Sequence, residues 1–255
     1  MTNKLLIIML VSMFVGLTNS AHAVLIGADN GDLYDHDVGS NTSTLIGNSG
    51  MAMFDIALDP LTNILYGISG SRDLYTIDQN NASLTFVGNA GSFINGLTFD
   101  SAGTLFGTGG TGLYSLDLVS GAATTIGSTG FNSSGDIAFD SSGNLYLSAT
   151  GSGGDQLVSL DSTTGVGTAI GNMGFSSVYG LNFSGSTLFG FTSGGLTLSI
   201  DTGTGVSTQI ATNSIAAYGA DGVGGVLAVS EPGTIVLLGL GVFGLGLSRK
   251  RIMRS

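Results

Sequence analysis

Aspartates carry most of the side-chain chemistry available to this 255-residue chain. Its 17 acidic residues are Glu231 and sixteen aspartates, whereas lysine and arginine together number six and cysteine is absent. Paired carboxylates can hydrolyse a glycosidic bond, and clustered carboxylates can bind a hard cation such as Ca²⁺. The lack of cysteine excludes thiol catalysis and zinc–thiolate sites. Glycan cleavage and calcium binding are therefore the chemistry that the composition leaves open.

Half of the aspartates occupy equivalent positions in a repeated sequence. They follow one strand-like string at Asp37, Asp78, Asp117, Asp161 and Asp201, and another at Asp59, Asp100 and Asp140. An aspartate that recurs after every strand is expected to cap the following turn, so we favour turn capping over paired-acid catalysis. A denser group, Asp29, Asp32, Asp35 and Asp37, lacks the spacing of an EF-hand loop. Calcium is the better ligand hypothesis for these carboxylates, but we favour turn capping over calcium binding, and no other cofactor is expected.

Residues 24–229 contain few other groups that could catalyse a reaction. They include no lysine, and their one histidine, His36, stands in a strand-like string where other copies have Ile or Leu. A Ser-His-Asp triad would depend on His36, yet no Gly-x-Ser-x-Gly elbow accompanies it, so we expect a strand residue that faces a loop. The run 107–112 fits Gly-x-Gly-x-x-Gly, but a strand follows where a dinucleotide site needs a helix. We predict no catalytic, cofactor-binding or metal-binding residues, and a protein that is not an enzyme.

Basic residues are concentrated at the two ends of the chain. Between residues 24 and 229, Arg72 stands against all sixteen aspartates, which gives this segment a formal charge of −15. Such a charge repels the phosphate backbone, so the sequence excludes a nucleic-acid partner.

Composition and repetition together predict the fold. Glycine supplies 44 residues, proline two, and charged residues only 9% of the chain, while apolar residues make up 42%. These values exclude disorder, collagen and helical bundles. Two patterns recur along the chain. In the first, Leu-Tyr-x-Leu/Ile-Asp is followed by Thr-x-Ile-Gly; the second is a pair of apolar segments, such as 55–59 followed by 64–67. Each piece is a short apolar or alternating run between turn residues, which is typical of a strand.

Four short strands in each repeat of about 41 residues indicate the blade of a β-propeller. We therefore predict an all-β, five-bladed propeller over residues 24–229, similar to secreted bacterial propellers with Leu-Tyr-x-Leu-Asp-x-x-Thr-Gly units. The first copy starts in mid-unit at Val24, and 218–221 supplies the missing strand, so the two ends should pair within one blade. A β-helix or an open sandwich is the alternative.

Residues 1–23 have the three parts of a secretory signal peptide. Lys4 precedes an apolar run from Leu5 to Leu17, and Ala21 and Ala23 are the small residues that signal peptidase recognises. We predict cleavage after Ala23. A retained membrane anchor is the alternative, although the run is shorter than the ~20 residues that a span needs.

Residues 230–255 have a different three-part pattern. Ser230-Glu231-Pro232 precedes an apolar stretch, 233–248, that is rich in glycine and leucine. As a helix this stretch would be roughly 24 Å long, and we predict that it crosses the membrane with the help of snorkelling basic side chains. The basic end that should remain in the cytoplasm comprises Arg249, Lys250, Arg251 and Arg254.

This tail resembles the PEP-CTERM sorting signal of Gram-negative bacteria. Glu231 and Pro232 match its short motif, whereas Ser230 replaces the first proline of the motif. The resemblance implies processing by an exosortase, a membrane protease associated with exopolysaccharide production, and transient anchoring in the inner membrane. An ordinary C-terminal membrane anchor is the alternative. On either interpretation residues 24–229 lie outside the inner membrane.

The sequence thus predicts a secreted or cell-surface propeller of a Gram-negative bacterium. Its expected partners are signal peptidase, an exosortase-type protease and exopolysaccharide, and its role would be structural or adhesive in exopolysaccharide or biofilm matrix. That role is implied by the resemblance of the tail. The alternatives are a calcium- or glycan-binding, lectin-like propeller and a glycan-active propeller enzyme.

Overall fold

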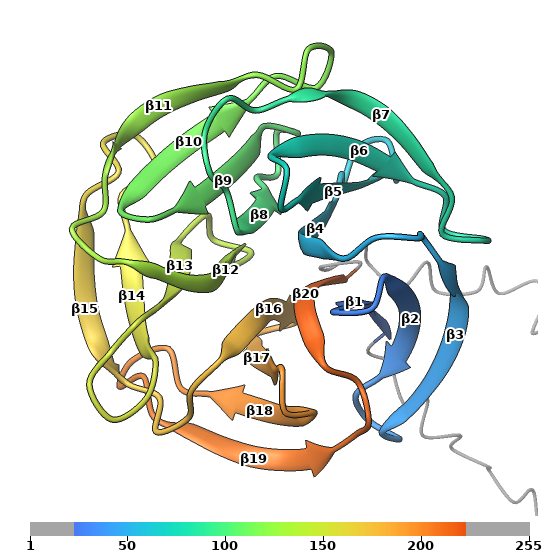
Figure 1. The fold of residues 1–255 in the computed structure, drawn as a ribbon. Coiled ribbons are helices and arrows are strands. Elements are labelled where there is room, and N and C mark those ends of the chain that lie inside the picture. Colours follow the sequence, from blue (N-terminus) through green and yellow to red (C-terminus); the bar gives the residue numbers. More distant parts are fainter. Residues whose placement is uncertain (1–22, 223–255) are drawn as a thin grey trace, which may run out of the picture.

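The computed structural model describes residues 23–222, and these residues form twenty β-strands around a central axis (Figure 1). The strands make five antiparallel sheets of four strands each. The predicted all-β, five-bladed propeller is therefore confirmed. The signal peptide and the sorting tail, predicted at residues 1–23 and 230–255, lie outside the described residues except for Ala23.

Each blade is a meander that runs from an innermost to an outermost strand. Blade 2 contains β4 (Met53–Leu58), β5 (Leu65–Ser69), β6 (Asp73–Ile77) and β7 (Leu84–Asn89). Blade 3 contains β8 (Gly96–Phe99), β9 (Leu105–Gly109), β10 (Gly112–Leu116) and β11 (Ala123–Ser128). Blade 4 contains β12 (Ser133–Phe139), β13 (Leu145–Ala149), β14 (Gln156–Leu160) and β15 (Gly167–Asn172). Blade 5 contains β16 (Val178–Ser184), β17 (Thr187–Thr192), β18 (Leu196–Ile200) and β19 (Ser207–Thr212).

Blade 1 closes the ring with strands from both ends of the described chain. Its innermost strand is β20 (Ala217–Gly222), and the next strands are β1 (Ala23–Ala28), β2 (Asp32–Asp37) and β3 (Thr42–Asn48). Gly222 pairs with Val24 and Ala220 with Ile26. The predicted pairing of the two ends within one blade is confirmed.

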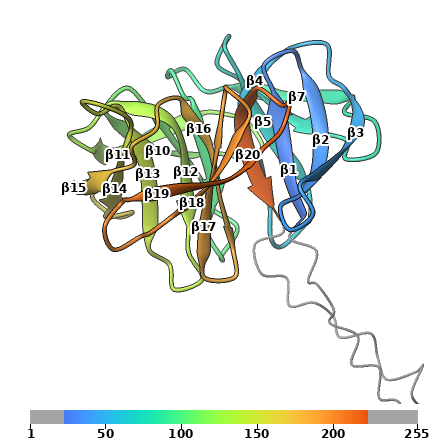
Figure 2. The same ribbon diagram turned by 90° about the horizontal axis from the view of Figure 1, so that it is seen from below.

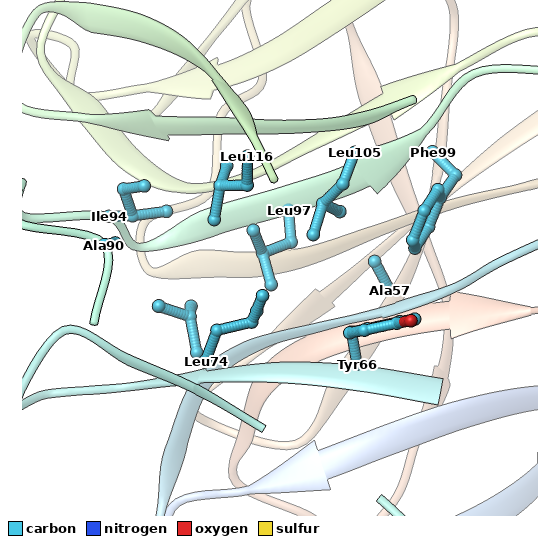
Figure 3. Packing of buried hydrophobic residues seen from close by; sticks show 10 residues of the cluster. Ala57, Tyr66, Leu74, Ala90, Ile94, Leu97, Phe99, Leu105 and Leu116 are labelled. Carbon is cyan, nitrogen blue, oxygen red and sulfur yellow. The ribbon is translucent and has the colours of Figure 1, made fainter. Parts of the chain in front are cut away.

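The hydrophobic core is divided among the five interfaces between successive blades. Each buried cluster combines apolar side chains of two neighbouring sheets. In the interface between blades 2 and 3, Leu74 and Ala57 face Leu97 and Leu105 (Figure 3). The inner strands β5, β8 and β9 are buried along their whole length, because both faces of a blade pack against a neighbour. Blade packing therefore holds the innermost strands β4, β8, β12, β16 and β20 in a ring.

Aromatic pairs stabilise three of these interfaces. The last aromatic residue of an innermost strand packs against the second strand of the preceding blade. The pairs are Tyr66–Phe99 at 5.5 Å, Phe106–Phe139 at 5.3 Å and Tyr146–Phe183 at 5.5 Å between ring centroids. In the closing strand β20 the equivalent residue is Gly222, so the pattern stops at blade 1.

Glycines at the outer rim allow neighbouring blades to approach closely. In the outermost strands of blades 1 to 4, a Cβ atom on the glycine of the Ile-Gly or Val-Gly string would collide with a backbone carbonyl in the next blade's outer turn. The contacts are Gly47 with Asn81, Gly88 with Ser120, Gly127 with Thr164 and Gly171 with Thr204. At the fifth interface Ala211 takes the place of this glycine, and the Asn41 amide donates to the Thr212 carbonyl at 3.0 Å.

The two ends of the described chain lie at the same face of the propeller. Gly222 ends β20 and Ala23 begins β1, and these strands are antiparallel. Figure 2 shows β1 and β20 side by side, with their ends at one face of the ring. Residues 23–222 contain no helix that is long and apolar enough to cross a membrane, and the span predicted at 233–248 falls outside them.

Candidate functional site

A cavity of about 570 Å³ opens at the centre of the ring, on the face where the innermost strands end. Its walls are mainly the last residues of these strands and, in blades 2 to 5, the turns that connect them to the second strand; Ser162, from the turn after β14, also contributes. Four carboxylates line it, those of Asp59, Asp100, Asp140 and Asp221. The lining includes no lysine, arginine or histidine. The cavity is therefore acidic, without a compensating positive group of its own.

Three polar side chains lie at one level of the cavity, each from a different innermost strand. Thr98 of β8, Asn182 of β16 and Asp221 of β20 occupy equivalent positions, where β4 and β12 have Ala57 and Ala138. The five innermost strands have the same backbone conformation at this position, but their side chains vary. The three polar residues therefore form a floor that only blades 3, 5 and 1 supply.

Asp221 links blade 1 to blade 2. Its two carboxylate oxygens accept hydrogen bonds from the backbone N–H groups of Gly222 and Leu58, each at 2.7 Å. Burial raises the pKa of Asp221 to about 7, against the opposing effect of these two hydrogen bonds. The Asp221 carboxyl group therefore holds its proton to a higher pH than an exposed aspartate does.

Asn182 and Thr98 are buried without a hydrogen-bond partner for their side chains. Asn182 is 4% exposed and Thr98 6%, and neither side chain forms a hydrogen bond within residues 23–222. The Asn182 amide lies against Gly222, because a Cβ atom there would be 2.8 Å from Nδ2. Their polar atoms are not among the enclosed, unpartnered atoms of the described chain, so they reach the cavity and are available to a molecule in it.

Deeper in the ring, two fully buried carboxyl groups face each other across the axis. Asp55 of β4 accepts hydrogen bonds from Ile56 and Leu97, and Asp136 of β12 accepts from Ile137 and Leu181, at 2.6–2.7 Å. Burial and mutual repulsion raise the pKa of Asp55, which hydrogen-bonds to Asp136. Burial likewise raises the pKa of Asp136, with repulsion from Asp221 adding to it. Through the backbone N–H groups of Leu97 and Leu181, the two carboxyl groups join blade 2 to blade 3 and blade 4 to blade 5.

The three aspartates at the mouth of the cavity cap turns. Asp59 accepts from the backbone N–H of Leu61 at 2.8 Å, and Asp100 from Ala102 at 2.9 Å. Asp140 accepts from the backbone of Ser142 at 2.8 Å and from the Asn144 amide at 2.7 Å. The turn role expected for these residues is confirmed.

The aspartates after the third strand of each blade have the same role. Carboxylate oxygens of Asp37, Asp78, Asp117, Asp161 and Asp201 accept backbone N–H groups of the following turn. Hydrogen bonds from the turn lower the pKa of each carboxyl group; for Asp161 the largest effect comes from the Thr163 hydroxyl, and for the other four from backbone N–H groups. In the denser group, Asp32 accepts from the Asn48 amide at 2.7 Å. Within the described residues no three His, Cys, Asp or Glu side chains converge to hold a metal ion.

His36 lies inside blade 1 and not beside a loop, contrary to the expectation from sequence. Its side chain is fully buried, and the ring contacts Phe191 of blade 5 edge-on, with centroids 6.0 Å apart. Nδ1 lies 2.9 Å from the Ser43 hydroxyl, while Nε2 has no partner. Burial lowers the pKa of His36. The imidazole is therefore out of reach of a substrate.

Of the site residues predicted from sequence, only Ala23 is described, and its carbonyl lies against Gly222, which lines the cavity. Ala23 is exposed at the start of β1 and followed by the fully buried Val24. Ala21, Glu231, Pro232 and the basic residues at 249–254 lie outside the described residues. The cavity floor and the acid pair were not predicted from the sequence. One sequence signal for the acid pair existed: an equivalent position of the innermost strands alternates between Asp and Gly, at 55, 96, 136 and 180.

Comparison with protein families identifies the C-terminal segment. A family described as the PEP-CTERM protein-sorting motif matches residues 228–251. The chain carries a PEP-CTERM sorting signal. This motif indicates an exported protein that passes through a membrane and is processed by an exosortase-type system. The resemblance stated from Glu231 and Pro232 is therefore confirmed.

Solved structures share the propeller fold with the PEP-CTERM chain at low sequence identity. One was determined in a study of the de novo evolutionary emergence of a symmetrical protein; it is 19% identical, with a TM-score of 0.52 over 78% of this chain and 93% of that one. Another is a structural-genomics protein of unknown function from Bacteroides thetaiotaomicron, 15% identical, with a TM-score of 0.53 over 75% of this chain and 57% of that one. No curated protein matches the sequence. These similarities show the fold alone.

Proposed function

We propose that this exported protein is a non-enzymatic component of the exopolysaccharide or biofilm matrix of a Gram-negative bacterium, where the propeller has a structural or adhesive role. The sorting motif at residues 228–251 carries the proposal, because it indicates the exosortase-type route that is associated with exopolysaccharide production. Signal peptidase, acting after Ala23, would remove the leader, and residues 233–248 would hold the protein in the inner membrane until processing.

The placement of the reactive side chains supports a role without catalysis. The acid pair Asp55 and Asp136 is fully buried and hydrogen-bonded to backbone, and His36 is enclosed between blades. The repeated aspartates accept hydrogen bonds within their own turns. A closed ring stabilised in this way is suited to a rigid structural unit.

Intact-mass analysis and fractionation test the proposal. We expect the exported product to begin at Val24 and to end near Glu231, and to sediment with the matrix. A chain that lacks 230–255 should be lost from the matrix fraction. Retention of Arg254 in the exported product would contradict processing at the motif. Recovery of the processed wild-type protein only in the free medium would contradict the matrix role.

The second candidate is a calcium- or glycan-binding, lectin-like propeller, and the acidic cavity favours it. Calorimetry with millimolar Ca²⁺ distinguishes the cation from the glycan. Absence of both heat and a melting shift would remove calcium from consideration. A glycan-active enzyme is the third candidate, and it requires that replacement of a single aspartate abolish a measurable glycan cleavage.

A further inference from the structure

The negative charge of the central cavity favours a positively charged ligand. Asp59, Asp100 and Asp140 stand at the mouth and Asp221 on the floor, with no basic residue in the lining. Arg72, the single arginine of residues 23–222, lies in the turn between β5 and β6, at the opposite end of the blade from the β4–β5 turn at the mouth. Such a lining attracts cations and repels carboxylate or phosphate ligands.

The floor of the cavity offers hydrogen-bond acceptors that the fold does not use. Each oxygen of Asp221 accepts one backbone N–H and retains a free lone pair. The side-chain oxygens of Asn182 and Thr98 accept nothing within the described chain, although both residues are more than nine-tenths buried. The two side chains make no hydrogen bond to the described chain and line the same cavity as the part-buried Asp221 carboxylate, which is the second, independent indication of a ligand.

The dimensions of the cavity favour an organic molecule. A volume of about 570 Å³ lies in the range of small-molecule sites. Gly222 replaces the aromatic residue found at the equivalent place in blades 3, 4 and 5, so no aromatic ring lines the cavity at this position. No three acidic or histidine side chains of the described chain converge as they would on a metal ion.

We propose that this cavity binds a small organic cation through a primary ammonium group, which donates hydrogen bonds to the Asp221 carboxylate, the Asn182 Oδ1 atom and the Thr98 hydroxyl. An ammonium group has three N–H donors, and the floor presents three kinds of acceptor. The carboxylates of Asp100 and Asp140 at the mouth accommodate a second amino group of the same ligand. This ligand goes beyond the proposed function, and its binding does not depend on where the protein is sorted.

Calorimetry on the purified full-length chain in detergent tests the proposal with 1,4-diaminobutane as the probe. Tetramethylammonium, which lacks N–H donors, 1,4-butanediol, which lacks charge, and CaCl₂ at equal ionic strength are the comparison ligands. The variants are Asp221→Asn, Asn182→Ala and Thr98→Val. Asp117→Asn is the matched control, because it removes the same charge from a turn outside the cavity.

We expect the diamine to bind and the three comparison ligands to bind at least tenfold more weakly. Each cavity variant should weaken diamine binding by about tenfold or more, the loss of one charge-assisted hydrogen bond, while Asp117→Asn leaves it unchanged. Asn182→Ala and Thr98→Val remove no hydrogen bond of the fold, so they remain informative if Asp221→Asn unfolds. Equal binding of tetramethylammonium or butanediol, tighter binding of calcium, or wild-type affinity in the Asn182 and Thr98 variants would overturn the proposal.

Discussion

At the scale of single residues, His36 is a buried polar group in a position that other blades fill with an apolar side chain. The equivalent residues are Ile77, Leu116, Leu160 and Ile200. Because Nε2 has no partner, we expect His36→Leu to raise the free energy of unfolding by about 1 to 3 kcal/mol. The pKa of His36 is lowered in the folded state, so the gain should increase as the pH falls below about 6.5.

Urea unfolding at pH 7.5 and pH 5.5 measures this effect. Ser43→Ala is the control, since it removes the partner of Nδ1 and should not stabilise the protein. A His36→Leu variant that is less stable than the wild type at both pH values would show that the imidazole contributes a favourable interaction.

The buried carboxyl groups predict a second, opposite dependence on pH. Asp221 has a pKa of about 7 in the fold, above its unfolded value, so the folded state holds an extra proton at mildly acidic pH. Stability should therefore fall as the pH rises from about 4 to 7, by up to ~1.4 kcal/mol per pH unit for each such group. The capped turn aspartates, with lowered pKa values, lose their contribution only below this window.

Urea unfolding between pH 4.5 and 8 in the His36→Leu background isolates the carboxyl groups. Asp221→Asn should reduce the slope without abolishing it, because burial also raises the pKa of Asp55, Asp136 and Asp155. Asp117→Asn, a replacement outside the cavity, should leave the slope unchanged over this range. An Asp221→Asn slope identical to the parent would mean that Asp221 does not titrate there.

At the scale of strands and blades, the outer glycines set how closely neighbouring sheets pack. A Cβ atom on Gly127 would collide with the Thr164 carbonyl of the next blade. We expect Gly127→Ala to lower the free energy of unfolding by about 1 to 3 kcal/mol through overpacking. Thermal unfolding measures the change. Ala211→Gly, at the equivalent place in blade 5, is the matched control and should cost less; equal losses in the two variants would refute the packing argument.

The strands and their turns were predictable because their signals are local. Alternating apolar residues, Gly at hairpins and Asp after each strand fix the four strands of a blade, and the half-units at Val24 and 218–221 fix the closure. The cavity floor depends instead on long-range placement. Asp55 and Asp136 meet only because ring curvature brings blades 2 and 4 together. Likewise, Thr98 and Asn182 line one cavity with Asp221 only in the folded ring.

At the scale of the whole molecule, the cavity and the two ends of the described chain share one face of the propeller. Gly222 lines the cavity and ends the described chain, and Figure 2 shows both chain ends at that face. Only residues 223–229 separate Gly222 from the tail, and seven residues span at most about 25 Å when extended. While the tail remains in the membrane, the mouth of the cavity should therefore face the lipid surface. Processing of the tail would then release the cavity to solvent.

Single cysteines test this orientation, because the chain has none of its own. Ser101→Cys places a thiol at the mouth, and Ser71→Cys places one in the β5–β6 turn at the opposite end; both side chains are exposed. In membranes containing the uncleaved chain, a bulky polyethylene-glycol maleimide should label position 101 more slowly than in the chain lacking 230–255. Labelling at position 71 should be equal in the two forms. Equal rates at position 101 would show that the tether leaves the cavity facing solvent, and ligand access would then be independent of processing.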